Sequence, residues 1–270
     1  MKTLKKLGLL FMLPLVFFIS YSKEDVKAEV EEKSFTDIFI AHAGGAIEDF
    51  IYTNSLEALN LSYSKGCKLF ELDVIETSDE KLVASHNWKH YKSITSYSGT
   101  VDDAPLTEEQ FLSLKIQGKF TPMNMETINE WFAGHKDARL VTDKINSPAE
   151  MLRKGFLFKD RLIMELFTWE AVEEAIKEGI KPMPSENLIF ETPDIEEKLS
   201  DLNIRYIAIS RRAIEENKDF LKRIKEKGIK TYVYHVNYDA GKDERYVLEN
   251  EMDYICGMYA DNLDLLLLQK

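Results

Sequence analysis

Short apolar runs alternate with longer amphipathic segments from Thr36 onwards. The apolar runs have the length of β-strands and cover residues 37–42, 68–74, 81–86, 138–143, 161–167, 187–191, 205–210, 230–236 and 253–260. Amphipathic segments at 54–66, 169–179 and 211–228 each end on a glycine, which is typical of a helix C-terminus. Strands that alternate with helices through short links predict an α/β fold with a mostly parallel sheet.

One link is too short for this alternation. Only the segment VIETSDEK separates Asp73 from Leu82, whereas a parallel crossover needs about a dozen residues or more. The runs 68–74 and 81–86 should therefore form an antiparallel hairpin with its turn near 78–81. Nine runs less one hairpin partner leave eight parallel strands, the number in a closed (β/α)8 TIM barrel.

The segment from Tyr91 to about Pro122 is irregular. It contains one short helical piece, TEEQFLSLKI, between stretches rich in turn-forming residues. An insertion after an early strand of a barrel lies on the catalytic face, which predicts a lid that faces the substrate. The alternative is a surface loop without a role.

The composition describes one globular domain. The chain has 270 residues, of which 44% are hydrophobic and 30% charged. Its net charge of −12 argues against a nucleic-acid binder or a general binder of anionic membranes, because both need a basic face. A phosphate site would have to be local, built from a few cations or a metal. Cys67 and Cys256 lie in or beside apolar runs, which favours free thiols over a disulfide.

The N-terminus carries an export pattern. Lys2, Lys5 and Lys6 precede an apolar run of about 15 residues, which is shorter than the roughly 20 residues of a membrane-spanning helix. We expect a signal peptide at 1–22, a flexible charged lead-in at 23–35 and a single domain at 36–270. The protein would then be secreted, at the cell surface or periplasmic. The alternative is an uncleaved N-terminal anchor that associates with the membrane.

Two acids in the run KLFELDV share one side of a strand. Glu71 and Asp73 are two residues apart, so both should face the barrel interior near its C-terminal edge. Carboxylates this close repel each other unless a cation lies between them or one is protonated. A hard divalent cation with oxygen ligands is the simplest solution. The alternative is that both acids are solvated or paired with lysines.

Histidines are expected at the same edge. If the hairpin turns about 79–80, its register sets His86 opposite Asp73, and His42 ends the first strand beside them. Imidazoles titrate near neutral pH, so this pair could supply a general base and a general acid. His235 adds an imidazole near the same edge. The remaining histidines lie in polar segments and are expected to be solvated: His90 and His135.

An ordered set of motifs from about residue 38 to 265 resembles the glycerophosphodiester phosphodiesterase family of the phospholipase-C-like superfamily. The motifs are AHAGG (41–45), TNSLEAL (53–59), FELDV (70–74), TSDEKLVASH (77–86), TPMNMETINEW (121–131), KTYVYHVN (230–237) and DYICGMYADN (253–262). The resemblance implies a TIM barrel that hydrolyses glycerophosphodiesters with a divalent metal, Ca²⁺ or Mg²⁺.

The resemblance also implies roles for individual residues. His42 would be the general base or nucleophile, and His86 would protonate the leaving alkoxide. Glu71 and Asp73 would hold the metal, which polarises a phosphoryl oxygen. The residues that would contact the substrate, above all its phosphate, are Lys144, Asn54 and Tyr234.

The chain departs from the family pattern at three positions. Ala43 replaces an arginine that would clamp the phosphate bidentately. Asn87 replaces the aspartate after the second histidine, and Thr142 stands where the family has a third acidic ligand. Asp143 could take over as that ligand if its strand is locally displaced. Glu165 is the other candidate, because a buried acid needs a partner.

Three hypotheses follow. The first is an exported, metal-dependent phosphodiesterase that releases an alcohol and glycerol phosphate from a glycerophosphodiester, a lysophospholipid or a glycerol-phosphate polymer. The second is a weak or inactive barrel that serves as a cell-surface binding module. The third is a glycosidase that uses the acid pair, and the spacing of the two acids on one strand disfavours it.

Overall fold

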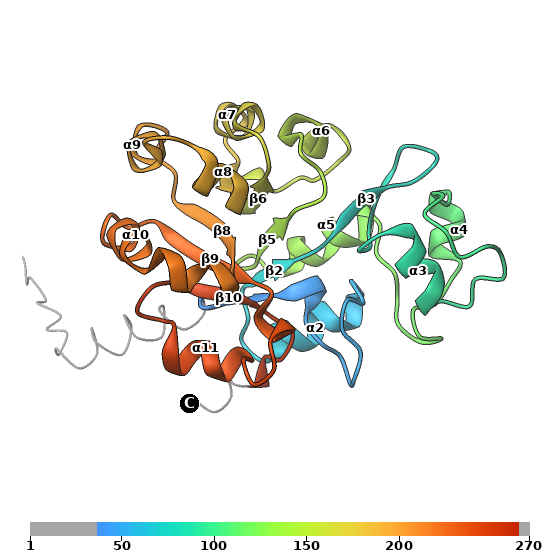
Figure 1. The fold of residues 1–270 in the computed structure, drawn as a ribbon. Coiled ribbons are helices and arrows are strands. Elements are labelled where there is room, and N and C mark those ends of the chain that lie inside the picture. The colour runs from blue at the N-terminus through green and yellow to red at the C-terminus, as the bar shows by residue number, and fades with distance from the viewer. Residues whose placement is uncertain (1–36, 265–270) are drawn as a thin grey trace, which may run out of the picture.

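In the computed structural model, which describes residues 37–264, eight parallel strands form one sheet. Hydrogen bonds order them β7-β6-β5-β2-β1-β10-β9-β8, and an isolated parallel bridge between Ser185 and Ala208 joins the two ends. The predicted TIM barrel is confirmed (Figure 1). The strands are β1 (Phe39–Ala41), β2 (Leu69–Glu71), β5 (Arg139–Thr142), β6 (Leu162–Leu166), β7 (Lys181–Pro184), β8 (Tyr206–Ser210), β9 (Lys230–Tyr234) and β10 (Gly257–Ala260).

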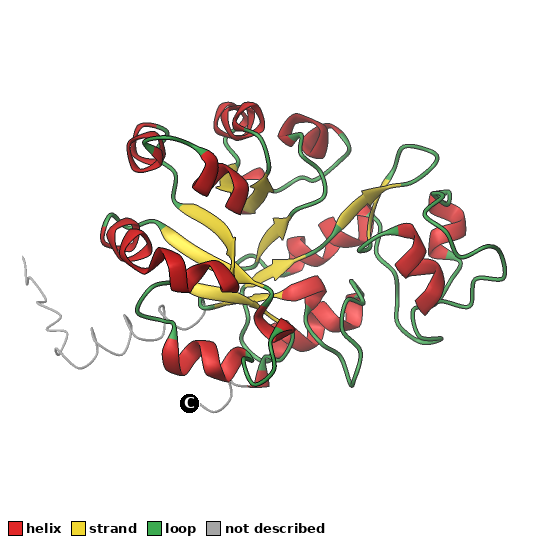
Figure 2. Cartoon of the chain, in the orientation of Figure 1, coloured by secondary structure: helices red, strands yellow, loops and turns green. Residues whose placement is uncertain are grey.

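Helices surround the barrel (Figure 2). Gly66, Gly179 and Gly228 have positive φ angles and follow the ends of three of them, as the sequence predicts. Among the described residues, no helix has the length and apolar character needed to cross a bilayer. The barrel helices are α2 (Leu56–Ser64), α5 (Met125–Gly134), α6 (Pro148–Arg153), α7 (Trp169–Glu178), α8 (Glu186–Glu191), α9 (Ile195–Asp201), α10 (Ile214–Glu226) and α11 (Glu244–Asn250).

One strand was predicted at the wrong place. The run 187–191 is helical, in α8, and the strand of this unit is β7 at 181–184. NLIFE is as apolar as a buried strand, and periodicity alone does not separate the two for so short a run. KPMP carries two prolines and so has no strand signature. The predicted number of eight parallel strands is still correct, because the wrongly predicted strand at 187–191 is offset by the missed strand β7.

The prolines of β7 lie where the barrel closes between β7 and β8, two strands that a single bridge joins. The backbone N–H of Ser185 donates to the carbonyl of Leu166 in β6 (3.0 Å). Because successive backbone groups alternate sides along a strand, the nitrogens of Pro182 and Pro184 face β8. Proline has no N–H to donate. This explains why a single bridge, and not a ladder, joins β7 to β8.

The hairpin forms as predicted, with a register that differs by one residue. Strands β3 (Val74–Glu76) and β4 (Leu82–Ala84) are antiparallel, and the turn closes with Thr77 donating to Lys81. The partner of Asp73 is Ser85, whose N–H donates to the Asp73 carbonyl (2.8 Å), and not His86. The tight turn is centred on one residue rather than between two.

The insertion packs as a small helical unit beside the barrel (Figure 1). It contains α3 (Trp88–Ile94) and α4 (Glu108–Leu112). Within 37–264, every residue that lines the active-site cavity described below lies outside 91–122, so the predicted lid is wrong. The alternative prediction, a surface loop without a role, is also wrong. The insertion covers the outer face of the hairpin, and the two form a separate hydrophobic core: Val83, Trp88, Tyr91, Leu106, Phe111, Ile116 and Phe120.

The core has two layers. A large cluster fills the space between the sheet and the helices, and it includes Phe70, Leu72 and Leu140. Cys67 is buried there, and both cysteines are free, as predicted. A second, smaller cluster fills the barrel interior: Ile40, Leu69, Val141, Ile163, Met183, Tyr206, Ala208, Tyr232 and Tyr259.

Candidate active site

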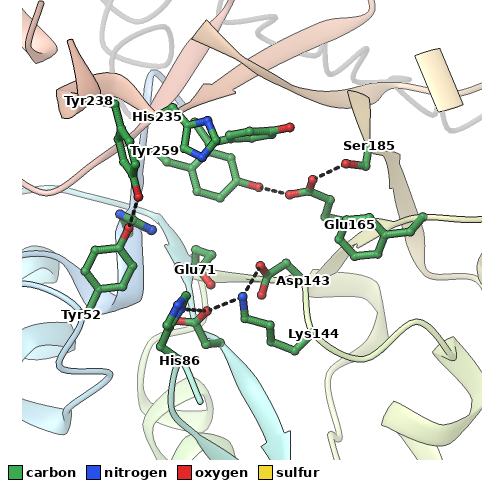
Figure 3. Close-up of a pocket in the computed structure, with 14 residues that line it drawn as sticks. Tyr52, Glu71, His86, Asp143, Lys144, Glu165, Ser185, His235, Tyr238 and Tyr259 are labelled. Carbon is green, nitrogen blue, oxygen red and sulfur yellow. Dashed lines mark hydrogen bonds and ion pairs between the residues drawn. The ribbon is translucent and has the colours of Figure 1, made fainter. Parts of the chain in front are cut away.

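Polar side chains form a layer directly above the apolar barrel interior. Alternation along a strand turns the second residue after each interior apolar residue to the same side. Six of these second residues help to line a cavity of about 340 Å³ at the carboxyl ends of the strands, which is the catalytic face of TIM barrels (Figure 3). The cavity is lined by His42, Tyr52, Glu71, Asp73, His86, Asp143, Lys144, Glu165, Phe167, Ser185, Tyr234, His235, Tyr238 and Tyr259.

Three acids converge on one side of the cavity. Glu71, Asp73 and Asp143 each offer an oxygen, and these oxygens all lie within 4.8 Å of one another. Burial and the charges of its two neighbours raise the pKa of Glu71 well above its ordinary value. Burial and the charge of Asp73 also raise the pKa of Asp143. These pKa shifts reflect first the burial of the carboxyl groups and then their mutual repulsion in a small space.

The cluster fits a divalent cation. Within the described residues, Glu71 Oε1 and Asp143 Oδ1 are buried without a hydrogen-bond partner. Buried polar atoms normally have one, so these oxygens are available as ligands. Carboxylate oxygens are the donors that Ca²⁺ and Mg²⁺ prefer. Of the two candidates for a third ligand, the geometry favours Asp143 over Glu165.

Glu165 is already engaged by the protein. Its oxygens accept hydrogen bonds from Ser185 Oγ (2.7 Å) and Tyr259 Oη (3.1 Å). Burial, together with the charge of Asp143, raises the pKa of Glu165 to about 7. Glu165 therefore lies on β6, the strand beside that of Asp143, without joining the acid cluster (Figure 3).

Asp73 is held from three sides. Its Oδ1 contacts His86 Nδ1 (3.1 Å) and Lys144 Nζ (3.2 Å). Asn54 Nδ2 donates to its Oδ2 (2.9 Å), while Asn54 Oδ1 accepts the Asp73 N–H (3.1 Å). Burial alone would raise the pKa of Asp73, but the bond from His86 and the charge of Lys144 lower it to about 2.

The position of Asn54 corrects a prediction. Its side chain is wholly buried behind Asp73, with both amide atoms used, and it does not line the cavity. Asn54 therefore positions Asp73 and is not placed to contact a phosphate. The cation that faces the cavity is Lys144, which also pairs with Asp143 (3.2 Å). Burial would lower the pKa of Lys144, but its two carboxylate partners raise it.

Each catalytic candidate histidine is oriented by a carboxylate. His86 Nδ1 faces Asp73, and His42 Nδ1 donates to Asp261 Oδ1 (3.0 Å). Burial alone would lower the pKa of His42, but the hydrogen bond and charge of Asp261 raise it. The sequence reasoning missed Asp261 although it lies in the DYICGMYADN motif. Strand alternation could have identified Asp261, because it comes two residues after Tyr259, which faces the barrel interior.

Tyr52 lies between the two imidazoles. Its ring makes edge contacts with His42 (4.5 Å between centroids) and His86 (5.2 Å). The backbone of Tyr52 is left-handed, and its carbonyl accepts a bond from His90 Nε2 (3.2 Å). Tyr52 stands in an irregular loop, so no pattern in the sequence points to it. His90 is thus half-buried in the wall behind the site and not solvated.

The remaining sequence candidates fall into two groups. Tyr234 and His235 both line the cavity, and His235 lies on the side opposite the acid cluster (Figure 3). His135 lies far from it and is not solvated, because its ring stacks on Trp131 (4.1 Å). Asn87 has a structural role, since its side chain accepts the N–H of His90 (2.7 Å) at the start of α3.

At the position where the family has an arginine, Ala43 contributes only its backbone N–H to the site. It lies in the 3-10 turn η1 (His42–Gly44), has φ of 47° and is fully buried. Its N–H donates to Glu71 Oε2 (2.6 Å), which fixes one oxygen of that acid. Among the described residues, Lys144 is the one lysine or arginine that lines the cavity.

Comparisons with known proteins show which family the chain matches. The profile of the Glycerophosphoryl diester phosphodiesterase family matches residues 43–199. No curated protein matches the chain. Solved structures with a similar fold include a glycerophosphodiester phosphodiesterase from Thermotoga maritima, with 22% identity, a TM-score of 0.65 and coverage of 86% of this chain and 98% of that one.

Two further solved structures have the same fold. A glycerophosphodiester phosphodiesterase from Parabacteroides distasonis has 17% identity and a TM-score of 0.63, and the match covers 86% of this chain and 95% of that one. A phosphodiesterase from Oleispira antarctica, in complex with its product sn-glycerol-3-phosphate, has 18% identity and a TM-score of 0.66 over 88% of this chain and 98% of that one.

Proposed function

The chain belongs to the glycerophosphoryl diester phosphodiesterase family and is a phosphoric diester hydrolase; on this premise, we propose that it is an exported enzyme that uses Ca²⁺ or Mg²⁺ to cleave glycerophosphodiesters into an alcohol and glycerol phosphate. The product bound to the Oleispira antarctica phosphodiesterase supports this choice of substrate.

The charge of the cavity supports metal dependence. Four carboxyl groups and one lysine line it, so an anionic phosphodiester would be repelled without a further cation. Glu71, Asp73 and Asp143 would hold that cation, because their oxygens converge and one oxygen each of Glu71 and Asp143 has no hydrogen-bond partner among the described residues. When bound, a divalent ion polarises a phosphoryl oxygen and neutralises developing charge. Lys144 would contact the same phosphate from beside Asp143, and Tyr234 would contact the substrate from the cavity wall.

The two carboxylate-bound histidines would move the protons. Asp261 fixes Nδ1 of His42, which leaves Nε2 to take a proton from the attacking water as general base. Asp73 fixes Nδ1 of His86, which leaves Nε2 to protonate the departing alkoxide. Because Asp261 raises the pKa of His42, the neutral base form is reached only above the ordinary histidine range. The rate should therefore rise with pH through the raised pKa.

The single observation that carries the proposal is the convergence of two acid-oriented histidines on a cluster of three acids. The test is turnover of glycerophosphocholine and bis-p-nitrophenyl phosphate by purified protein with Mg²⁺, with Ca²⁺ and with EDTA. We expect metal-dependent hydrolysis and a loss of about 10²–10⁴-fold in His42→Ala. His135→Ala is the matched control. If no diester is cleaved, the inactive binding module becomes the better account.

Export is proposed from the N-terminal pattern alone. The run of lysines and apolar residues at 1–22 lies outside the described residues. N-terminal sequencing of protein recovered from the culture medium or cell envelope would start after Ser22 if the signal is cleaved, and at Met1 in the membrane fraction if it serves as an anchor.

A further inference from the structure

A second cavity, of about 260 Å³, adjoins the first at His42. The two cavities share five residues: His42, Tyr52, His235, Tyr238 and Tyr259. The hydroxyls of Tyr52 and Tyr238 meet at 3.5 Å. Figure 3 shows this contact at the edge of the catalytic cavity. The second cavity is lined in addition by Ile51, Val236, Asn237 and Asp261.

The polar groups of this second cavity are already satisfied within the protein. Asp261 accepts from His42, and Asn237 Nδ2 donates to Glu244 Oε1 (3.0 Å). His235 Nδ1 contacts Ser210 Oγ (3.3 Å), and the Tyr259 hydroxyl donates to Glu165. A ligand with hydroxyl groups would therefore find few free partners there. What the cavity offers is the side chains of Ile51 and Val236 and the faces of tyrosine rings.

The outer end of the second cavity is apolar and open. Ile51 is 48% exposed and Tyr238 is 57% exposed, and both stand on loops after strands of the barrel. Among the described residues, no lysine or arginine lines this cavity, so an anionic group gains nothing there. An alkyl chain fits these walls, because its burial releases water from apolar surface on both partners.

The position of this cavity indicates which arm of the diester it holds. It is lined by His42 and not by His86. In the proposed reaction His86 protonates the departing alcohol, so the cavity adjoins the arm that stays on the phosphate. For a glycerophosphodiester, that arm is the glyceryl group.

We propose that the second cavity is a subsite for an alkyl or acyl chain on the retained glyceryl arm, with Ile51 and Tyr238 as the residues that select it. The assignment rests on the proposed function and names its substrate class as monoacyl glycerophosphodiesters. A glycerol-phosphate polymer, which is polar and anionic throughout, does not match these walls.

The test uses methyl, butyl and octyl p-nitrophenyl phosphates with Mg²⁺, in which p-nitrophenol leaves and the alkyl phosphate is retained. Each methylene that enters the cavity should raise kcat/KM by about fourfold until the cavity is filled, from the transfer free energy of a buried methylene. Concentrations are kept below those at which the octyl compound forms micelles.

Substitutions in the wall of the second cavity test whether this cavity holds the alkyl chain. In Ile51→Ser and Tyr238→Ser, the octyl-to-methyl ratio of kcat/KM should fall roughly tenfold, because part of the apolar wall is gone. Leu157→Ser removes an exposed apolar side chain that lines neither cavity, and it should keep the ratio. Both site variants replace exposed residues, so the fold should persist.

The outcomes separate this inference from the proposed function. Absence of turnover of the methyl compound with either metal would overturn the proposed function. Turnover that does not depend on chain length would overturn only the subsite. A chain-length effect that persists in Ile51→Ser and Tyr238→Ser would place the chain elsewhere and also overturn it.

Discussion

Divalent metal should stabilise this fold, and one substitution should remove most of that effect. In the metal-free protein, burial and the negative charges of the neighbouring acids raise the pKa of both Glu71 and Asp143. A carboxyl group whose folded-state pKa is raised binds its proton more tightly in the folded state. It therefore costs stability as pH rises above its ordinary value. At pH 8 the metal-free cluster is a destabilising element, and a bound cation removes that cost.

The size of the effect follows from linkage. At a metal concentration 100 times Kd, selective binding to the folded state contributes about 2.7 kcal/mol. For a domain of this size, about 2–4 °C of Tm correspond to 1 kcal/mol, so Tm should rise by about 5–11 °C. The assay is thermal unfolding at pH 8 with EDTA, Mg²⁺ and Ca²⁺.

Asp143→Asn separates repulsion from metal binding. It removes one charge next to Glu71, so Tm in EDTA should rise above that of the wild type, while the shift with metal should shrink to a few degrees or less. The exposed Asp253 provides a control, since Asp253→Asn should change neither value. An equal metal shift in the wild type and in Asp143→Asn would refute the assignment of the three acids as ligands.

Two other predictions test the supports of the site. Asn54→Ala leaves the buried N–H of Asp73 and one of its oxygens without a partner, so urea unfolding should show a loss of roughly 2–3 kcal/mol, and metal-dependent turnover should fall with it. Normal stability would mean that water replaces the amide. The pKa of Glu165 is raised from 4.5 to about 7, so the wild type should lose up to about 3 kcal/mol between pH 4.5 and 8 through this group, and Glu165→Gln should flatten that dependence. An unchanged slope in the variant would show that Glu165 titrates normally.

Much of the fold could be predicted because most strands and helices show their pattern within their own short stretch of sequence. The hairpin followed from chain length, and the ends of three helices followed from glycines at positive φ. The unit at 181–191 could not be assigned correctly, because a proline-containing strand and a short apolar helix reverse the usual signals. The insertion was predicted as a lid because its packing depends on long-range contacts between α3, α4 and the hairpin, which no local pattern records.

The site was predictable to the extent that it follows strand parity. Glu71 and Asp73 were placed correctly on one side of β2, and His42 at the end of β1. Tyr52 could not be found in this way, because its place between two imidazoles depends on a left-handed backbone in an irregular loop. Asn54 was misplaced because its position next to a helix N-terminus suggested an anion, whereas its amide faces Asp73.

Strand parity also settles the third acid. Val141 belongs to the barrel interior and Leu140 to the layer beneath the helices. Alternation therefore turns Thr142 outward and Asp143 inward, without the local displacement that the family spacing required. The same rule relates Leu69 to Glu71, Ile163 to Glu165 and Tyr259 to Asp261. The site therefore keeps a third acid although position 142 is a threonine, because Asp143, the next residue, reaches the same cluster. The adjacent Lys144 still pairs with Asp73.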